Sequence, residues 1–327
     1  MQLRSIAGAL LLVAATAGLQ WAGASDQAPG PRAETALNAL APAGVARSWG
    51  NDDNGELGNS LPFVDQDAPV AVSGLTNVVE LSAGDHYSLA LLSDSTVMSW
   101  GSDTSGQLGN GATTGNQAAP VAVSGLSGVK AVAAGFRHSL ALLSDGTVMS
   151  WGADTSGQLG NGATTGDQAS PVAVSGLSSV KAVAGGASHT LALLSDGTVM
   201  SWGNDGNGQL GNGATTGDQA APVAVSGLSG VRAIAAGIYH SLALLSDGTV
   251  MSWGADTSGQ LGNGATTGNQ AAPVAVSGLS GVKAIAGGGT HSLARLSNGT
   301  VMSWGSDTYG QLGNGATTGN QAAPVAV

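Results

Sequence analysis

Cysteine is absent from this chain of 327 residues, and charged residues make up only 9% of it. Without cysteine there is no disulfide framework, no lipid-modified cysteine and no thiol nucleophile. The few charges are unequal, 9 basic against 20 acidic, which gives a formal net charge of −11 without any basic run. Because phosphate binding requires clustered lysine and arginine, this balance disfavours nucleic acid and anionic membrane surfaces as partners.

Long apolar runs are also scarce, and the one near the N-terminus, Ile6 to Leu19, is short for crossing a bilayer. It follows a positively charged start at Arg4 and precedes Ala22-Gly23-Ala24, which has the small-x-small form of a cleavage site. The pattern predicts a signal peptide over residues 1–24, cleaved after Ala24, and a mature protein that is secreted, periplasmic or at the cell surface. An uncleaved membrane anchor is the alternative. The alanine- and glycine-heavy composition is typical of a bacterial protein.

What the chain has in abundance is repetition. A unit of 51 residues recurs almost letter for letter, marked by a Trp-Gly pair at Trp49, Trp100, Trp151, Trp202, Trp253 and Trp304. Self-similarity at a fixed period indicates one supersecondary unit copied, with each copy burying its apolar face against its neighbours. We therefore expect a linker over residues 25–44, which are rich in proline, and a single repeat domain over residues 45–327.

Each unit contains four short strand candidates. In one copy they are Val129 to Ala133, His138 to Leu143, Thr147 to Trp151 and Pro171 to Val174. Asp145-Gly146 is a strong hairpin signal, because both residue types tolerate positive φ. Four strands per repeated unit predict an all-β fold, a β-propeller of four-stranded antiparallel blades. A parallel β-helix is the structural alternative, whereas the glycine content and the lack of a 3.6-residue period disfavour helical repeats.

The number of units predicts an unclosed ring. Five full blades occupy residues 75–123, 126–174, 177–225, 228–276 and 279–327. Before them, Val45 to Val72 supplies only half a blade. Propellers usually close by completing one blade from both chain ends. The expectation is therefore either a sequence truncated at Val327, from six or seven blades, or an arc that does not close.

Two motifs in register carry a family resemblance. Val132-Ala133-Ala134-Gly135-x-x-His138-Ser139-Leu140-Ala141-Leu142 and Trp-Gly-x-Asp-x-x-Gly-Gln-Leu-Gly recur through residues 45–327. They resemble the signatures of the regulator-of-chromosome-condensation repeat family. The resemblance implies a propeller, known in that family with seven blades of about this length. Exported members of the family are known as protein-binding modules, among them a bacterial inhibitor of a β-lactamase.

Neither the repeated histidines nor the acidic loops predict a metal, and we expect no cofactor. His138, His189, His240 and His291 share one repeat position, and ligands spread around a ring do not converge on one point. We expect their imidazoles to satisfy backbone groups of the turns. The acidic loop Asn51 to Glu56 superficially suggests calcium, but a single aspartate before glycine is explained by a turn in which the carboxylate caps N–H groups. No catalytic motif occurs in the sequence, which predicts a protein that is not an enzyme.

The informative residues are the two positions between Gly and His, which differ in every copy while their flanks stay fixed. They are Asp85-His86, Phe136-Arg137, Ala187-Ser188, Ile238-Tyr239 and Gly289-Thr290. Large apolar and stacking side chains at neighbouring turns are what an interface requires. We therefore predict a protein-binding face at these turns; drift at unconstrained positions is the alternative interpretation.

The predicted function is that of an exported, non-enzymatic scaffold that is a monomer and binds an unidentified protein. Two alternatives stay open. The resemblance implies guanine nucleotide exchange on a small GTPase as in the best-known family member, which the leader and the acidic charge disfavour. A propeller that binds or processes glycans is the other, although hydrolysis needs a pair of facing carboxylates. Fold alone licenses none of these functions.

Overall fold

The protein is built from β-strands joined by tight turns. A computed structural model describes residues 10–14, 44–61, 63–113, 115–164, 166–214, 217–266, 268–315 and 319–327. Within these residues the strands form one three-stranded sheet and five four-stranded antiparallel sheets. We number the sheets blade 1 (β1–β3), blade 2 (β4–β7), blade 3 (β8–β11), blade 4 (β12–β15), blade 5 (β16–β19) and blade 6 (β20–β23). The predicted all-β fold of four-stranded blades is confirmed.

Strands of one kind recur at the same place in each blade. The inner strands are β4 (Val78–Ala83), β8 (Val129–Ala134), β12 (Val180–Gly185), β16 (Val231–Ala236) and β20 (Val282–Gly287). The second strands are β5 (Tyr87–Leu92), β9 (His138–Leu143), β13 (His189–Leu194), β17 (His240–Leu245) and β21 (His291–Leu296). The third strands are β6 (Val97–Gly101), β10 (Val148–Gly152), β14 (Val199–Gly203), β18 (Val250–Gly254) and β22 (Val301–Gly305). The outer strands are β7 (Gln117–Ala122), β11 (Gln168–Ala173), β15 (Gln219–Ala224), β19 (Gln270–Ala275) and β23 (Gln321–Ala326).

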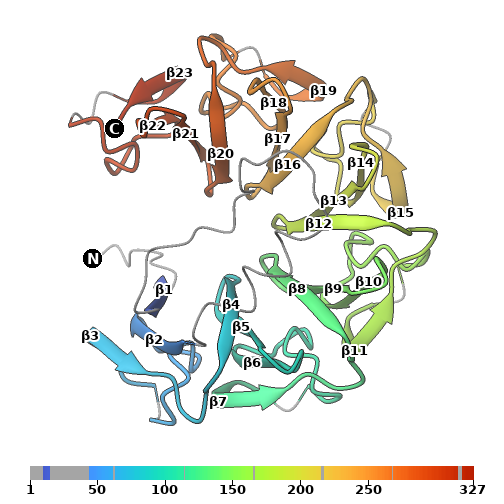
Figure 1. The fold of residues 1–327 in the computed structure, drawn as a ribbon, viewed down its shortest axis with the longest axis vertical. Coiled ribbons are helices and arrows are strands. Elements are labelled where there is room, and N and C mark those ends of the chain that lie inside the picture. Colours follow the sequence, from blue (N-terminus) through green and yellow to red (C-terminus); the bar gives the residue numbers. More distant parts are fainter. Residues whose placement is uncertain are drawn as a thin grey trace.

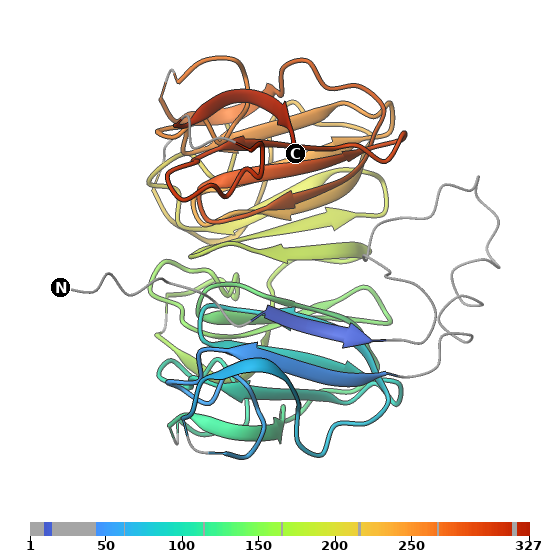
Figure 2. The ribbon, with the colours of Figure 1, turned by 90° about the vertical axis from the view of Figure 1, so that its left-hand side faces the viewer.

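The six blades stand around a common axis, with the inner strands nearest the centre (Figure 1). Successive inner strands pack on one another from β4 round to β20. Blade 6 and blade 1 flank an opening in the ring, and the view onto that side shows the two blades on separate halves of the molecule (Figure 2). The blades therefore form an arc with two unlike ends.

Blade 1 is built differently from the rest. Its β2 (Val45–Gly50) and β3 (Gln66–Ala71) correspond to the third and outer strands of the other blades. Next to β2 lies β1 (Leu10–Ala14), which pairs antiparallel with it from Leu10 opposite Trp49 to Ala14 opposite Val45. This segment belongs to the predicted signal peptide. The rest of residues 1–24, and the predicted linker except Gly44, lie outside the described residues.

The predicted strand boundaries are correct to within one residue for the first three strands of a blade, but the outer strand begins earlier than expected. β11 starts at Gln168, so Pro171 lies inside the strand and not at its start. A proline is tolerated there because β11 is an edge strand and its outward side needs no N–H donor.

The core lies between blades and not within them. Leu191 and Val199 of blade 4 pack with Val231, Ala243 and Trp253 of blade 5 in one apolar cluster. Similar clusters join each other pair of neighbouring blades. Small residues alternate with large ones on the second strand, so the next sheet can approach closely while leucine and tryptophan fill the space between.

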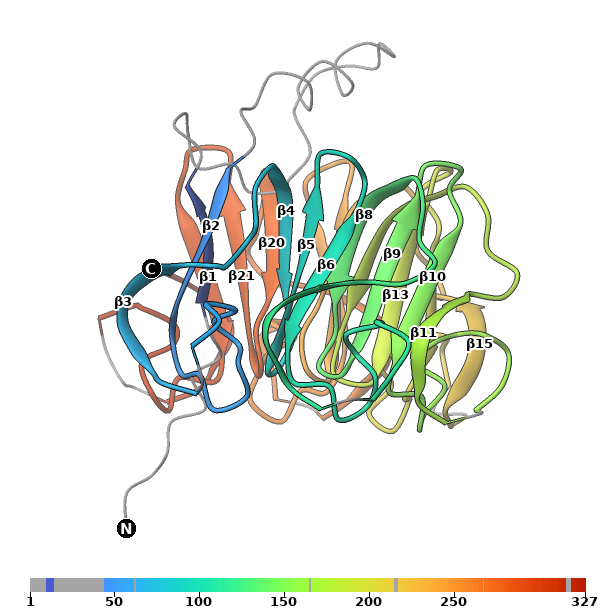
Figure 3. The ribbon, with the colours of Figure 1, turned by 90° about the horizontal axis from the view of Figure 1, so that it is seen from below.

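The two ends of the strands present different kinds of connection. The Gly-x-x-His turns lie at the end where His138 pairs with Gly152, and the loops that follow Trp-Gly begin at that same end. The hairpins such as Asp145-Gly146 lie at the opposite end, so turns and hairpins occupy opposite faces of the arc (Figure 3). Within the parts of the chain that the structure describes, no helix has the length and apolar character to cross a bilayer.

Candidate functional site

The repeated histidines join neighbouring blades. His189 in blade 4 is fully buried, and its Nε2 lies 3.0 Å from Ser241 Oγ in blade 5. Ser241 Oγ donates in turn to the backbone oxygen of Gln209, which also accepts the indole N–H of Trp253. His138 and His240 make the same contact with Thr190 and Ser292. The structural interpretation of these histidines is thus supported, but their partner is a side-chain hydroxyl of the next blade and not a backbone group.

The protonation state of these imidazoles follows from that geometry. Since the Ser241 hydroxyl proton points to the carbonyl of Gln209, His189 must be the donor through Nε2–H. Its Nδ1 is buried without a hydrogen-bond partner, as is that of His138 and His240. Burial lowers the pKa of His189 to about 3, with a further lowering from the two neighbouring histidines, and lowers the pKa of His138 and of His240 to about 4. These imidazole rings are therefore neutral near pH 7 and fill buried space between neighbouring blades.

The aspartates of the Trp-Gly loops have a structural role too. The Oδ1 atom of Asp103 accepts the backbone N–H of Leu108 at 3.0 Å, and Asp52 and Asp256 do the same with Leu57 and Leu261. Each carboxylate thereby closes its own loop, over five residues and so more widely than the turn we expected. In the described part of the chain, no group of three or more histidine and acidic side chains has the arrangement of a metal site.

The variable turns form one continuous belt. The backbone N–H of Asp85 donates to Phe136 O, that of Phe136 to Gly186 O, that of Ala187 to Ile238 O and that of Ile238 to Gly289 O, at 3.0–3.3 Å. Each bond crosses from one blade to the next. The carbonyl of the second variable residue is also fixed, as in Ser188 O, which accepts from Asn204 N at 2.7 Å. The belt is therefore rigid in its backbone and free to vary only in its side chains.

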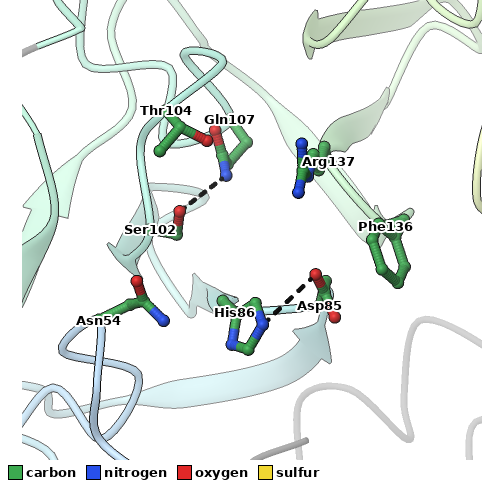
Figure 4. Close-up of a pocket in the computed structure, with 8 residues that line it drawn as sticks. All are labelled: Asn54, Asp85, His86, Ser102, Thr104, Gln107, Phe136 and Arg137. Atoms are coloured by element: carbon green, nitrogen blue, oxygen red, sulfur yellow. Dashed lines mark hydrogen bonds and ion pairs between the residues drawn. The ribbon is translucent and has the colours of Figure 1, made fainter. Parts of the chain in front are cut away.

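Two neighbouring turns of the belt enclose a shallow pocket of about 190 Å³. Figure 4 shows its side chains arranged around a common centre. They come from blades 1, 2 and 3: Asn54, Asp85, His86, Ser102, Thr104, Gln107, Phe136 and Arg137. The structure thus brings together Asp85, His86, Phe136 and Arg137, four of the ten residues predicted for the binding face.

A charged cluster forms one wall of this pocket. His86 Nδ1 lies 2.9 Å from Glu56 Oε1, and its Nε2 lies 3.5 Å from Asp85 Oδ2. A neutral imidazole donates through only one nitrogen, so both contacts become hydrogen bonds only when the ring is protonated. Burial raises the pKa of the Asp85 carboxyl, and the charges of His86 and Arg137 partly oppose that rise. The Arg137 guanidinium carbon lies 5.9 Å from the centre of the Phe136 ring, within reach of a cation–π contact.

The other predicted site residues lie further along the belt. Ala187, Ser188, Ile238, Gly289 and Thr290 are half-buried, and Tyr239 is 47% exposed. Ile238 and Tyr239 are the large side chains of that part of the face. They are separated from the pocket by the small pair Ala187-Ser188 in blade 4, so the belt has two places where a partner meets large side chains.

Sequence reasoning missed Glu56 and Glu80. Glu56 stands where the other copies have glutamine, and it is the buried partner of His86. Glu80 replaces the alanine of the other inner strands and accepts the N–H of Val132 at 3.1 Å, while burial raises its pKa to about 7. Both could have been found as departures from the repeat, had such departures been sought outside the turns.

Comparison with known proteins agrees with the arrangement of blades and turns. Residues 34–327 match the family model described as the RCC1-like domain. The chain is 33% identical over 300 residues to the ultraviolet-B receptor UVR8 of Arabidopsis thaliana, covering 88% of this chain and 67% of the receptor. It is 36% identical over 251 residues to human HERC6, a probable E3 ubiquitin-protein ligase, covering 73% of this chain but only 24% of that protein.

A solved structure shows the same likeness in three dimensions. Yeast RCC1 (Prp20), in its complex with Kap60, superposes with a TM-score of 0.74 at 27% identity, over 86% of this chain and 70% of that one. The family match over most of the chain, the repeated motifs and the blade architecture lead to one conclusion: the protein is a member of the RCC1-like β-propeller family.

Proposed function

We propose that the protein is an exported, non-enzymatic scaffold that binds another protein through the belt of variable turns. The observation that carries the proposal is the contrast within each turn between a fixed backbone and a varied pair of side chains. Hydrogen bonds hold successive turns side by side from Asp85 to Gly289. A rigid platform of this kind loses little conformational entropy on binding, which is the main advantage of a preorganised interface.

The chemistry of the belt suits a protein partner. Tyrosine and arginine are the residue types most enriched among the side chains that dominate binding energies at interfaces, and the belt carries Tyr239 and Arg137. Phe136 and Ile238 add apolar area. The ring nitrogens of His86 face the carboxylates of Glu56 and Asp85 and not a nucleophilic hydroxyl, which favours a binding role over hydrolysis.

Relatives provide a precedent but no partner. Yeast RCC1 is seen bound to Kap60, and a second crystal structure of the same protein, Prp20p of Saccharomyces cerevisiae, is described together with its binding properties to Gsp1p and histones. These statements hold for yeast RCC1. For this chain they favour a macromolecular partner held by a propeller, in agreement with the belt.

Export is the second part of the proposal. It is supported by the sequence of residues 1–24, with Arg4 before the apolar run and Ala22-Gly23-Ala24 after it. Cleavage after Ala24 would remove β1 from the edge of β2. An intact mass measurement of the protein recovered from its native host tests this part: a chain beginning at Ser25 supports it, and a chain that retains residues 10–14 contradicts it.

The binding function is tested by quantitative capture from periplasmic extract and culture medium of that host. The bait is the natural protein, compared with a variant carrying F136A, R137A, I238A and Y239A. A matched control carries changes at the opposite face, K130A and K181A. Proteins retained by the natural chain and by the control, but lost with the belt variant, support the proposal. Equal recovery with the belt variant contradicts it.

A further inference from the structure

One loop breaks the repetition in a way that exposes apolar surface. After the Gly-Asn that ends the Trp-Gly motif, the other five copies read Gly-Ala-Thr-Thr-Gly, as in Gly162 to Gly166. In blade 1 the same five positions read Ser-Leu-Pro-Phe-Val, from Ser60 to Val64. Leu61, Phe63 and Val64 are 53%, 52% and 55% exposed. We call residues 60–64 the apolar loop.

The exposure of the apolar loop does not depend on either end of the arc. Blade 3 has a blade on each side, yet its described residues Gly162 to Thr164 at the corresponding positions are exposed as well. The apolar loop is anchored to the following blade, where Ser60 N donates to Ala118 O at 2.8 Å. Gly162 N donates in the same way to Ala220 O. The loop thus occupies its ordinary place in the repeat, and only its side chains differ.

The apolar loop lies at the turn end of the strands, as the belt does. Its anchor Ala118 follows Gln117, which pairs with Gly101 in the neighbouring strand. Gly101 pairs in turn with Tyr87, the residue that follows the variable pair Asp85-His86. Adjacent strands lie about 5 Å apart, so two such spacings, about 10 Å in all, separate the anchor from that pair. The apolar loop and the pocket therefore belong to the same face of blades 1 and 2.

Hydrogen bonds connect the apolar loop to the pocket through the Trp-Gly loop of blade 1. The carboxylate of Asp52 accepts the backbone N–H of Val64, and Asp65 Oδ1 accepts the N–H of Asp52 at 2.9 Å. Two residues after Asp52, Asn54 lines the pocket together with Asp85 (Figure 4). The apolar loop and the pocket are thus two parts of one surface, with bonded backbone between them.

This surface is acidic, and its acids are departures from the repeat. Asp53, which is exposed, stands where the other copies have threonine or glycine. Glu56 replaces a glutamine, and Asp85 is the one acid among the variable pairs. Residues 48–129 contain nine acidic residues but no lysine or arginine. The arginine at the pocket, Arg137, comes from blade 3. The departures of blades 1 and 2 therefore add apolar area and negative charge to the same face.

A protein segment with both apolar and basic side chains fits this surface. Contact with the apolar loop removes apolar side chains of both partners from water. Lysine or arginine of the segment meets acids that few cations of this chain neutralise, whereas an acidic segment is repelled. The separation of about 10 Å corresponds to about three residues of extended chain. A short segment therefore reaches the apolar loop and the pocket together.

We propose that the partner docks on this surface through a segment that is both basic and apolar. Apolar side chains of the segment pack on Leu61, Phe63 and Val64, and a lysine or arginine of the segment pairs with Asp53 and Asp85. The inference rests on the proposed binding function, because it names the chemistry of the partner at blades 1 and 2. It extends the binding surface from the variable turns to the apolar loop.

Two variants each remove one property of the surface. The loop variant carries L61A, F63T and V64G, and the acid variant carries D53T and D85A. Each change introduces the residue of another copy of the repeat.

Two matched controls remove the same kinds of side chain at the opposite face. The hairpin variant carries D145N and D196N, because Asn298 stands at that position in blade 6. V79T removes a valine that is 50% exposed. Urea unfolding midpoints establish that all the variants fold.

The probes are short labelled peptides whose affinities are measured by fluorescence anisotropy. One consists of lysine and leucine, one of lysine and serine with the same charge, and one of glutamate and leucine. The natural chain and both controls should bind the lysine–leucine peptide about tenfold more tightly than either other peptide. The loop variant and the acid variant should each bind it about tenfold more weakly than the natural chain does. Equal affinity of the natural chain for the three peptides, unchanged affinity in the loop or acid variant, or an equal loss in the controls would overturn the proposal.

The capture experiment separates this inference from the proposed function, because the belt variant keeps Asp53, Asp85 and the apolar loop. Partners that are lost with the belt variant but retained by the loop and acid variants would uphold the proposed function and overturn this inference alone. Partners retained by the belt variant contradict the proposed function, and the peptide affinities still decide the chemistry of the surface.

Discussion

Ser188 and His189 are neighbours in the chain, yet they belong to two different regions: one is buried and repeated between blades, and the other varies from blade to blade. His189 lies in a junction between blades, where it is fully buried and every contact recurs 51 residues later. Ser188 lies in the belt, where its carbonyl is fixed and its side chain differs in each copy. The junction holds the arc together and repeats closely from blade to blade, with Tyr87 in place of the histidine in blade 2, so it does not distinguish one partner from another. The belt can.

The invariant glycine and the histidine that flank each variable pair separate the junction from the belt, as Gly186 and His189 do in blade 4. A Cβ on Gly186 would lie 2.1 Å from His189 Cε1, so the ring occupies the space that a side chain would need. Gly186 and His189 are thus both fixed by this packing, and only the two residues between them, Ala187 and Ser188, are free of it. This arrangement explains how the chain keeps one architecture while it varies one surface.

The largest expected effect belongs to the junction. Trp202→Ala removes a fully buried indole that donates to Gln158 O at 2.9 Å, and we expect a loss of about 3–5 kcal/mol in the free energy of unfolding. Trp49→Ala, in blade 1 where the indole is only half-buried, should cost less than half as much. Urea unfolding of both variants measures the difference. Equal losses would mean that packing between blades is not what stabilises the arc.

The next effect tests the boundary itself. Gly186→Ala forces the added methyl against the His189 ring and should cost about 1–3 kcal/mol. Gly206→Ala is the control, because its nearest neighbour is Asn204 Oδ1 at 3.5 Å and its φ is not in the left-handed region. The same unfolding measurement applies. If both alanines are tolerated, the histidine is not packed as described.

The buried histidines also predict a pH dependence. The pKa of His189 is lowered from the usual 6.5 to about 3. Between these two pH values the imidazole is protonated in the unfolded chain but neutral in the folded chain. The free energy of unfolding is therefore unaffected by these histidines above about pH 6.5. It falls as the pH drops towards 3, by about 1.4 kcal/mol per pH unit for each such histidine. His189→Gln should make that fall less steep. His291→Gln should change the slope less, since His291 is only half-buried and burial lowers its pKa less completely.

The smallest effect on stability is expected in the belt. Tyr239→Ser copies the residue of blade 4, and the exposed phenol it removes should change the free energy of unfolding by no more than about 0.5 kcal/mol. Recovery of partner in the capture experiment should nevertheless fall. A variant that loses stability and binding together would place Tyr239 with the junction and not with the belt.

Much of this architecture could be predicted from the sequence, because the same unit occurs five times in full and once in part, so its fixed and variable positions can be compared. The 51-residue period and the Asp-Gly hairpins located the first three strands. The predicted start of the outer strand at Pro171 is wrong, because β11 begins at Gln168 and an edge strand tolerates a proline within it. The belt was found because its variation stands out against fixed flanks.

The rest depended on contacts between blades, which no single copy contains. That His86 meets Glu56, 30 residues earlier in the chain, follows from how blade 2 stands beside blade 1. The hydroxyl partners of His138, His189 and His240 lie 52 residues ahead, in the next blade, so no single copy of the repeat contains both groups. The pocket, for the same reason, emerges only when three blades are placed together.

One measurement tests most directly whether the belt carries the function. In a single variant the four other turns are given the Ala-Ser pair of residues 187–188, by D85A, H86S, F136A, R137S, I238A, Y239S, G289A and T290S. The account predicts a cooperative unfolding transition close to that of the natural chain and the loss of every partner captured by it. Retention of those partners by this uniform ring would contradict the account.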